Sequence, residues 1–580
     1  MAWKHLFERK TLEMLREEMN SEQKLHRVLG TVSLTSLGVG GIIGAGIFAM
    51  TGRVAAFDAG PAVVISFLLA GIACVFAAMC YAEFASLAPV AGSAYTYTYA
   101  TLGELLAWII GWDLILEYSM ACGVVASHWS HYLNVALKTI FGISIPPFLM
   151  TDPFTPMVVD GQVVHGWMNL PAILVISVMT MILIRGIRES VFANTVLVIV
   201  KVAVVLLVIV LGIGYVNTEN WTSIPVEQRN YVDLTDYLNR NPERAALLSE
   251  GVNYRNMDGA TLLKEHPEFA ASLSEVEVAQ LKRIPNESKK WGMLAVLGVK
   301  DLLEPLDEMI RSPFIPYGFS GLMVGAAIVF FSYIGFDSIS THAEEAVRPQ
   351  RDVPLAIIAS LVICTILYIL VSGVLSGMEP YHGIDPQAAV AEAFRRQAVT
   401  HDSWLLNSIA AFLAVGALAG LTSVILVMFL SQSRVFLAMA RDGLLPRSVF
   451  GVVHEKFRTP HRSTILTGVA IALTAGFLPI RMLEEMVSIG TLMAFVLVCG
   501  SVMILRIHRP DYPRPFRCPA LFIVAPLGMM VNLTLMLFLP LDTWYRLAGW
   551  LMLGIVIYFL YGIRHSVLRT RSKPTIVAEQ

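Results

Sequence analysis

Charged residues are scarce in this chain. Only 15% of its 580 residues are Asp, Glu, Lys or Arg, whereas 56% are hydrophobic, and the mean hydropathy is +0.65. Because about 20 apolar residues make one helical span, this balance indicates an all-α protein that crosses the membrane many times. The net charge of −2 and the dispersed Lys and Arg residues argue against a nucleic-acid partner.

Cysteines are few, and the signatures of common enzymes are missing. The six cysteines all lie outside the long polar segment 217–317, so we expect no structural disulfide there. The sequence has no zinc-protease H-E-x-x-H, no Walker loop for phosphate and no G-x-S-x-G elbow for a serine nucleophile. We expect no enzyme, no cofactor, no metal site and no ATP-driven pump. Transport would then run on an ion gradient or on exchange.

Apolar segments divide the chain into regions. Residues 1–30 are highly charged and lack the apolar core of a cleaved signal peptide, so we expect the first helix to stay in the membrane. Twelve segments are long enough to be spans: 31–56, 61–88, 102–137, 167–184, 191–216, 318–340, 354–378, 405–439, 463–480, 484–506, 519–540 and 543–563. The predicted regions are an N-terminal segment 1–30, spans 31–216, an insertion 217–317, spans 318–506, two last spans 519–563 and a tail 564–580.

The basic residues of the short loops predict the orientation. With a cytoplasmic N-terminus, the cytoplasmic side holds 23 Lys and Arg residues and the other side six, leaving out the insertion. Both termini are therefore expected in the cytoplasm, in a multi-pass protein of the cell membrane, with the insertion outside.

The polar segment 217–317 is the anomaly of the chain, with 16 acidic and 11 basic residues. Ser274-Glu275-Val276-Glu277 reads as a capping box that opens a short helix. Trp291–Ile310 is a mildly amphipathic run suited to a membrane surface. The insertion is either a helical addition without chemistry, or a lid or partner-docking platform over the outer vestibule.

Two spans have centres unsuited to a simple membrane helix. The first span holds Ile43–Phe48 with two glycines, and the sixth holds Tyr333–Asp337 with a glycine and an aspartate. Backbone that opens at membrane depth must line a cavity or lie buried in protein, and paired breaks in two halves point to a transporter's binding site. Opened half-helices offer N–H groups to a carboxylate and carbonyls to a cation, which matches an α-amino acid. An organic cation or a carboxylate alone would fit half of this arrangement, and Gly40 with Gly44 also suits plain helix packing.

Lys201 lies deep in the fifth span, where an ionisable residue is a functional hypothesis by default. Burial favours the neutral amine, which would let it load and release a proton near neutral pH. The alternative is a lysine that reaches out to an interface.

Acidic residues lie in two of the spans. Asp113 and Glu117 are four residues apart and share a helix face in the third span. Glu117 could pair with a cation or titrate, or be a structural carboxylate. Asp337 could cap the restarting half-helix or take part in coupling. His128 and His131 show no metal-ligand pattern, and we interpret them as interface residues.

Six motifs in order resemble a known family. They are Gly44–Phe48, Pro89–Tyr95, Gly111–Tyr118, Phe331–Glu345, Arg351–Pro354 and Ala440–Pro446. The chain resembles the amino acid–polyamine–organocation superfamily, and within it the cationic amino-acid transporter branch and its bacterial relatives, from about Arg27 to Arg564.

The resemblance implies twelve transmembrane helices in a five-plus-five inverted repeat of the leucine-transporter type, with helices 1 and 6 unwound. It implies a substrate carboxylate held by Ile43, Gly44, Ala45 and Gly46, and an amino group held by Phe331, Ser332 and Ile334. Lys201 resembles the lysine that replaces a sodium ion in proton-coupled relatives, with Thr422 and Ser423 nearby. Glu117 and Asp337 match acidic positions of the branch. The chain departs from the family at Ala45, where relatives often carry Ser or Thr, and in the length of its insertion.

The sequence therefore predicts secondary active uptake of an amino acid, coupled to protons through Lys201. Two alternatives remain: an exchanger or facilitator for cationic amino acids, and a sensor or scaffold that binds amino acid without moving it. The expected partners are the substrate, protons, the lipid bilayer and a protein at the insertion.

Overall fold

A computed structural model describes most of the chain. It covers residues 8–10, 29–44, 46–87, 93–159, 162–185, 191–248, 254, 257–282, 284–341, 343, 346–455, 457 and 459–571. Ala45, the segment 88–92 of the second family motif, the Glu344-Glu345 pair of the fourth and most of the N-terminal segment lie outside these residues.

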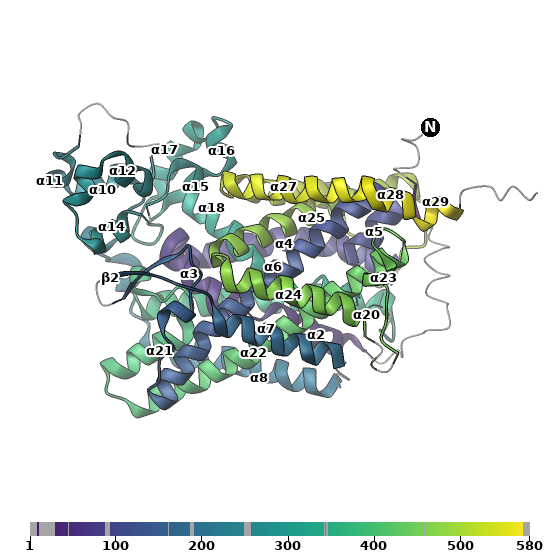
Figure 1. Cartoon of the computed structure of the whole chain (residues 1–580), viewed down its shortest axis with the longest axis horizontal. Helices are drawn as coiled ribbons and strands as arrows, with labels where there is room; N and C mark the ends of the chain where they lie inside the picture. The colour runs from purple at the N-terminus through teal and green to yellow at the C-terminus, as the bar shows by residue number, and fades with distance from the viewer. Residues whose placement is uncertain are drawn as a thin grey trace, which may run out of the picture.

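The protein is built of helices that run along the long axis of the molecule (Figure 1). The helices of the bundle are α2 (Thr31–Ile42), α3 (Thr51–Val54), α4 (Val63–Leu87), α5 (Ser93–Thr101), α6 (Glu104–Phe141), α7 (Leu170–Arg185), α8 (Val191–Gly212), α18 (Gly318–Val329), α19 (Ser338–Thr341), α20 (Pro349–Met378), α21 (Ala389–Thr400), α22 (Trp404–Arg441), α23 (Arg447–Phe450), α24 (His461–Phe477), α25 (Ile480–His508), α26 (Leu521–Phe538), α27 (Leu541–Ile557), α28 (Ile563–His565) and α29 (Val567–Arg571).

Many of these helices suit a membrane. Within the described residues, eight helices are long and apolar enough to cross a bilayer: Thr51–Leu87, Glu104–Phe141, Val198–Tyr215, Pro349–Met378, Trp404–Arg441, Ile480–His508, Leu521–Phe538 and Leu541–Arg569. Three more apolar helices are shorter: Thr31–Ile42, Leu170–Arg185 and Gly318–Tyr333. The chain is thus an integral membrane protein with a helical bundle.

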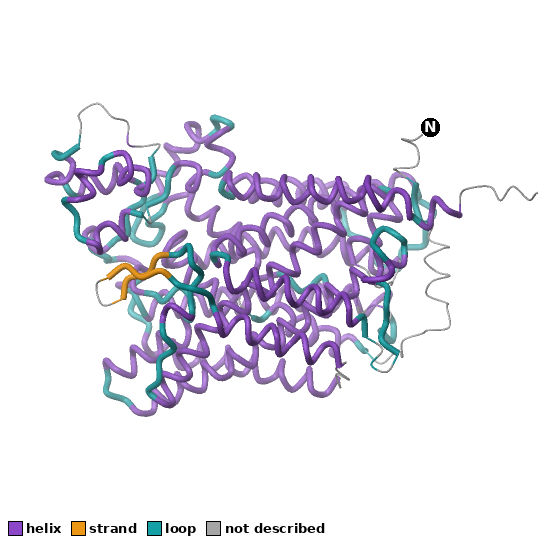
Figure 2. The backbone as a smooth tube through the Cα atoms, viewed as in Figure 1, coloured by secondary structure: helices purple, strands orange, loops and turns teal. Residues whose placement is uncertain are grey.

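Short connections gather at the two ends of the bundle (Figure 2). The insertion helices α10 (Leu234–Arg240), α11 (Pro242–Ala245), α12 (Gly259–Glu265) and α14 (Glu275–Leu281) lie at one end, and α23, α28 and α29 lie at the other (Figure 1). The basic loops and the insertion are therefore on opposite ends of the molecule.

The insertion consists of short helices, with smaller pieces at α9 (Glu219–Thr222) and α13 (Pro267–Ala271). Eight buried side chains, including Leu234, Leu262 and Phe269, give its outer part a small core of its own. The predicted capping box is confirmed, because the Ser274 hydroxyl accepts from the Glu277 amide and the Glu277 carboxylate accepts from the Ser274 amide. These donors from Ser274 hold the pKa of Glu277 below its usual range. The run Trp291–Ile310 is divided among α15 (Glu287–Trp291), α16 (Met293–Val296) and α17 (Lys300–Ile310).

A small β-hairpin departs from the expected all-α architecture. Strands β1 (Pro156–Val159) and β2 (Gln162–His165) pair antiparallel, with Met157 opposite Val164, in the connection between α6 and α7. Valines dominate both strands, and branched side chains suit extended backbone.

All six cysteines are buried and free.

The first helix is interrupted at mid-length. Helix α2 ends at Ile42, and Ile43 is extended, with φ −70° and ψ 106°. Helical structure resumes in the π-helical turn η2 (Gly46–Met50), continues through α3 and ends in a second π-helical turn, η3 (Ala55–Ala59). The glycines around this break weaken the helix, because glycine loses more conformational freedom than other residues when it is ordered.

The sixth helix is interrupted in a similar way. Helix α18 passes into the 3₁₀ turn η9 (Phe330–Tyr333), Ile334 is extended, and Gly335 has φ +118°. A side chain at Gly335 would place its Cβ atom 2.8 Å from the backbone carbonyl of Gly41. Both backbone conformation and close approach therefore require glycine here.

We predict that Gly335→Ala destabilises the fold by about 1–3 kcal/mol, because a side chain is strained at this φ and meets the backbone of α2. Gly373→Ala is the matched control, since its nearest neighbour lies 3.9 Å away and alanine favours a helix by about 0.5–1 kcal/mol. Thermal unfolding in detergent should show a lower Tm for the first variant only. Equal Tm values for the two variants would contradict the role of this approach.

Candidate functional site

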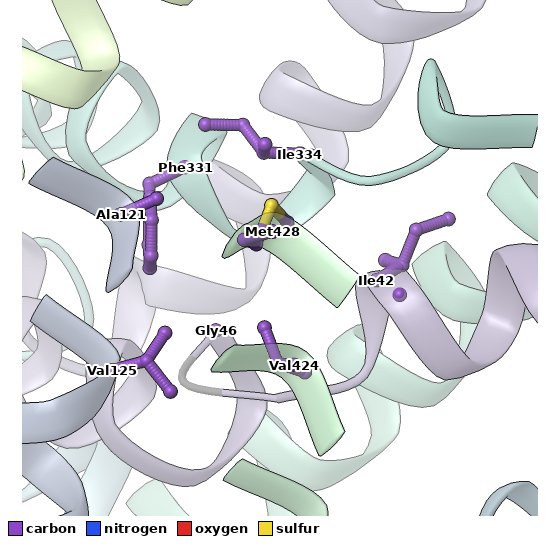
Figure 3. Close-up of a pocket in the computed structure, with 9 residues that line it drawn as sticks. Ile42, Gly46, Ala121, Val125, Phe331, Ile334, Val424 and Met428 are labelled. Carbon is purple, nitrogen blue, oxygen red and sulfur yellow. The ribbon is translucent and has the colours of Figure 1, made fainter. Parts of the chain in front are cut away.

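The two interrupted helices meet across a small cavity. A Cβ atom at Gly46 would lie 2.4 Å from Cβ of Ser332, so the first break lies directly against the second. Nine residues from four parts of the chain line the cavity, and Figure 3 shows their side chains around a common space: Gly41, Ile42, Gly46, Ala121, Val125, Phe331, Ile334, Val424 and Met428. None of these nine side chains carries a charge or a polar group.

The cavity is narrow in this conformation. The cavity volume is about 10 Å³, which is room for about one water molecule. A larger ligand therefore requires that the surrounding helices move apart.

A tyrosine that the sequence analysis did not single out joins the two breaks. The Tyr368 hydroxyl, on α20, lies 2.8 Å from the Ile42 carbonyl oxygen and 2.7 Å from the Ser332 carbonyl oxygen. One hydroxyl has one proton, so it can donate to only one of these carbonyls at a time. The other carbonyl keeps a free lone pair at the break. No local pattern identifies this tyrosine among apolar span residues.

Ser332 also carries an unsatisfied side chain. Its hydroxyl is buried and has no hydrogen-bond partner within the described part of the chain. A buried polar group without a partner is costly, so a hydroxyl left in this state beside Gly46 indicates a place for a ligand atom.

The structure distributes the other predicted binding residues around the breaks. Gly46, Phe331 and Ile334 line the cavity. Ile43 and Gly44 are buried at the break, and Gly44 packs against Val424. Ala45 lies outside the described residues, so its position is not assigned.

Lys201 connects the fifth helix to the first. Its side chain is 1% exposed, and its Nζ donates to the Gly40 carbonyl at 2.7 Å. Its aliphatic part also lies against Gly420 of α22, where an added Cβ atom would be 3.5 Å from Lys201 Cγ. The lysine therefore touches α2 and α22, just before the first break.

The two hydroxyl residues of α22 face different neighbours. Ser423 donates to the Gly420 carbonyl at 3.2 Å, on the turn that contacts Lys201. Thr422 donates to the Leu418 carbonyl and accepts from Trp129 Nε1 of α6 at 3.0 Å. The Thr422 hydroxyl therefore points toward α6.

Three carboxylates come together beside the second break. Asp337 accepts from the Tyr118 hydroxyl at 2.5 Å and from the Gly335 amide at 3.2 Å. Glu117 lies within electrostatic reach of Asp337 and Asp113 and has Thr491 of α25 as a hydrogen-bond neighbour. Both carboxylate oxygens of Asp113 are buried without a hydrogen-bond partner among the described residues. Such a cluster can hold protons, because like charges at close range disfavour joint ionisation.

A buried ionic network closes the end of the site toward the insertion. Arg53 of α3 pairs with Glu484 of α25, and both side chains are almost fully buried. His128 Nε2 lies 3.4 Å from Glu484 Oε1, and its Nδ1 lies 3.1 Å from the Gln387 carbonyl oxygen.

This network corrects one interpretation of the sequence. His128 was expected at an interface but is fully buried, and Arg53, its neighbour in the network, is only 6% exposed. Only tertiary packing brings Glu484 to both residues, and the sequence alone does not indicate this pairing. His131 is half-buried.

The insertion is hydrogen-bonded to the outer half of the first helix. The Ala56 carbonyl, in η3, accepts from Asn230 Nδ2 at 2.9 Å and from the Tyr317 hydroxyl at 2.7 Å. The backbone N–H of Asn230 donates to the Tyr381 hydroxyl at 3.2 Å. The insertion therefore holds the helix segment that carries Arg53.

Comparison with protein families gives a long match. The model of a family described as amino acid permease matches residues 29–252 and 293–559. The residues between these stretches, 253–292, belong to the insertion.

Curated relatives match over similar lengths. A methylthioribose transporter of Bacillus subtilis (strain 168) is 37% identical over 563 residues, which cover 97% of this chain and 99% of that protein. The branched-chain amino acid permease BcaP of the same organism is 37% identical over 566 residues, with the same coverage of 97% and 99%. A vacuolar cationic amino acid transporter 4 of Arabidopsis thaliana is 33% identical over 492 residues, 84% of this chain and 64% of that protein.

We predict that Asn230→Ala loosens the outer half of the first helix, because the Ala56 carbonyl loses one of its two donors from the insertion. Hydrogen–deuterium exchange of residues 51–59 should become severalfold faster. The control is Asn241→Ala, whose side chain donates to the Tyr231 hydroxyl and the Tyr237 carbonyl, both within the insertion. Unchanged exchange in the Asn230 variant would show that these bonds do not restrain the helix.

Proposed function

The chain belongs to the amino acid permease family, and we propose that it is a secondary active transporter that carries an amino acid through the cavity between its two interrupted helices. The observation that carries this proposal is the contact of the two breaks around one cavity. Beside it lie the Ser332 hydroxyl, which no described residue hydrogen-bonds, and two carbonyls that share the proton of the Tyr368 hydroxyl.

The binding arrangement follows from the polarity of the two breaks. Ile43 and Gly44 follow the end of α2, and helical structure starts again at Gly46, where N–H groups favour a carboxylate. The proposed carboxylate site is Ile43, Gly44 and Gly46 together with Ala45, which lies outside the described residues. The carbonyls at Phe331, Ser332 and Ile334 end a helix and favour an ammonium group. A bound amino group could take the Ser332 or Ile42 carbonyl that Tyr368 leaves free.

We further propose twelve spans in a five-plus-five inverted repeat. Two features support it. The first and sixth helices are both interrupted at mid-length. The third and eighth helices, α6 and α22, each have 38 residues, and they pack against each other. In such a repeat, the first and sixth helices would occupy equivalent positions, and so would the third and eighth helices.

The orientation proposed is with both termini in the cytoplasm and the insertion outside. The basic connections carrying α23 and α29 lie at the end opposite the insertion helices (Figure 1). This arrangement agrees with the excess of Lys and Arg expected on the cytoplasmic side.

Lys201 is proposed as the coupling residue. When charged, its amine makes a charge-assisted hydrogen bond to Gly40 and holds α8 against the helix that carries the first break. Loss of the proton weakens this bond and favours a state in which the two helices separate. Glu117, Asp337 and Ser423 lie beside the second break and the Lys201 contact, and with Thr422 they complete the proposed coupling set.

Two other functions compete with this one. An exchanger or facilitator would show counterflow without a gradient. A sensor or scaffold would bind amino acid without uptake and would lose its partner when the insertion is deleted.

The cavity also favours one class of substrate. Its lining from α6 and α22 is Ala121, Val125, Val424 and Met428, and Lys201 adds a positive charge behind the first break. A cationic side chain would lose hydration here without gaining an anionic partner in the lining. We therefore propose a neutral amino acid with an apolar side chain, which agrees with the branched-chain relative rather than with the cationic transporters.

The coupling proposal predicts that Lys201→Ala loses accumulation driven by an inward proton gradient in proteoliposomes, while counterflow of substrate persists. Lys138→Ala, at the exposed end of α6, should accumulate substrate like the wild type. Full proton-driven accumulation by the Lys201 variant would refute coupling through this residue.

The substrate proposal predicts the outcome of a thermal-shift screen against all twenty amino acids. A ligand at 100 times its Kd stabilises the folded state by about 2.7 kcal/mol, so the preferred substrate raises Tm by several degrees. Leucine, isoleucine or valine should give the largest shifts. Shifts with arginine and lysine but none with leucine would reverse the proposed preference and favour the cationic alternative.

A further inference from the structure

Helix α17 leaves part of its apolar face exposed. Asp307 is fully buried, and Leu303, Leu306 and Ile310 are partly buried on the same side of the helix. Leu302 is 79% exposed and Met309 is 75% exposed. A helix on a water-facing domain normally turns its large apolar side chains inward and its charged ones outward. In α17 a carboxylate lies inside while two large apolar side chains lie outside.

Specific contacts fix this orientation. Asp307 accepts from Arg311 at 2.9 Å and lies 3.5 Å from Lys290 Nζ. Its other oxygen accepts from the Ser320 amide at 2.7 Å, in the first turn of α18. Because this turn begins a membrane helix, α17 cannot rotate Leu302 and Met309 inward without breaking a buried ionic cluster.

The apolar surface continues onto the preceding segment. Val296 of α16 and Leu297 directly after it are 59% and 58% exposed. Together with Leu302 and Met309 they form what we call the apolar ridge. The ridge residues are not part of the small hydrophobic core of the insertion that includes Leu234, Leu262 and Phe269.

The position of the ridge places it at the end of the hydrophobic layer. Trp291, just before α16, packs on Phe538 at the end of α26, with ring centroids 6.3 Å apart. The Leu541 amide, at the start of α27, donates to the Ser288 hydroxyl at 3.4 Å. In Figure 1, α16 lies beside the end of α27 that faces the insertion. The ridge is therefore next to the turn between two membrane helices.

The two neighbouring membrane helices also expose apolar side chains. Met530 and Leu533 of α26 are 58% and 45% exposed, and Tyr545, near the start of α27, is 69% exposed. The apolar ridge lies next to the turn that joins these two helices, and an exposed apolar patch beside a lipid-facing surface is favoured by lipid.

We propose that α16 and α17 form an interfacial anchor whose apolar ridge inserts into the headgroup and acyl-chain boundary of the bilayer. The ridge is flanked by exposed Asp301 and Glu308, which an anionic surface would repel. The occupant is therefore a zwitterionic phospholipid surface. The anchor fixes the base of the insertion to the membrane, and it does not depend on which substrate the cavity takes.

The location of the apolar ridge can be tested with nitroxide spin labels, by comparing how often each label collides with oxygen and with a water-soluble nickel chelate. Full-length protein with Leu302→Cys or Met309→Cys would be spin-labelled and reconstituted in phosphatidylcholine vesicles. Leu247→Cys is the matched control, because Leu247 is 56% exposed in the outer part of the insertion. The six native cysteines are buried, and unsubstituted protein measures their background labelling.

The ratio of oxygen to nickel-chelate collision should be severalfold higher at positions 302 and 309 than at 247, because oxygen concentrates in lipid and the chelate in water. Two results would overturn the anchor. A ratio at 302 and 309 equal to that at 247 would place the ridge in water. Exclusion of both reagents would show that another protein or a second copy covers it. A Val296→Cys label provides an independent reading if either variant fails to reconstitute.

Discussion

Backbone groups that open inside a membrane must find hydrogen-bond partners without water, and this constraint governs the centre of the molecule. At the first break, the carbonyl of Gly40 receives the Lys201 ammonium, and that of Ile42 shares the Tyr368 hydroxyl with Ser332. Lys201 lies on α8 and Tyr368 on α20, so other helices supply the donors that these opened carbonyl groups need. Among the described residues, the Ser332 hydroxyl has no hydrogen-bond partner, and one of the two carbonyls is without the Tyr368 proton at any time. These are groups that a zwitterion could satisfy.

The site is closed in this conformation. Its cavity holds about one water molecule, and the Arg53–Glu484 pair with His128 closes it on the side of the insertion. A buried ion pair is costly to separate, because each charge would be left without its partner. Opening on this side therefore requires a ligand or proton that binds the open state more tightly than the closed one. The insertion adds to the closure because Asn230 and Tyr317 donate to the Ala56 carbonyl. The proposed lipid anchor would limit how far the insertion can move.

Local patterns predicted part of this arrangement. Two glycines in the first span and a glycine with an aspartate in the sixth indicated the breaks, and the depth of Lys201 in its span indicated a functional role, because each feature is anomalous within a single membrane helix. Tyr368, Glu484 and Asn230 gave no such signal. Their importance depends on partners distant in sequence, such as Ser332, Arg53 and Ala56, which only packing brings together. The run Trp291–Ile310 was predicted to suit a membrane surface, but the exposure of Leu302 and Met309 within it depends on the buried contacts of Asp307. The capping box at Ser274 was predictable because its two partners are three residues apart.

We propose that a proton on Lys201 is linked to occupancy of the cavity. Calorimetry of substrate binding in buffers of different ionisation enthalpy measures this linkage directly, as the number of protons exchanged per amino acid bound. We expect proton exchange in the wild type near neutral pH and none with Lys201→Met, which keeps an unbranched apolar side chain in place of the amine. Equal proton exchange in both proteins would contradict it and would move the coupling to another group.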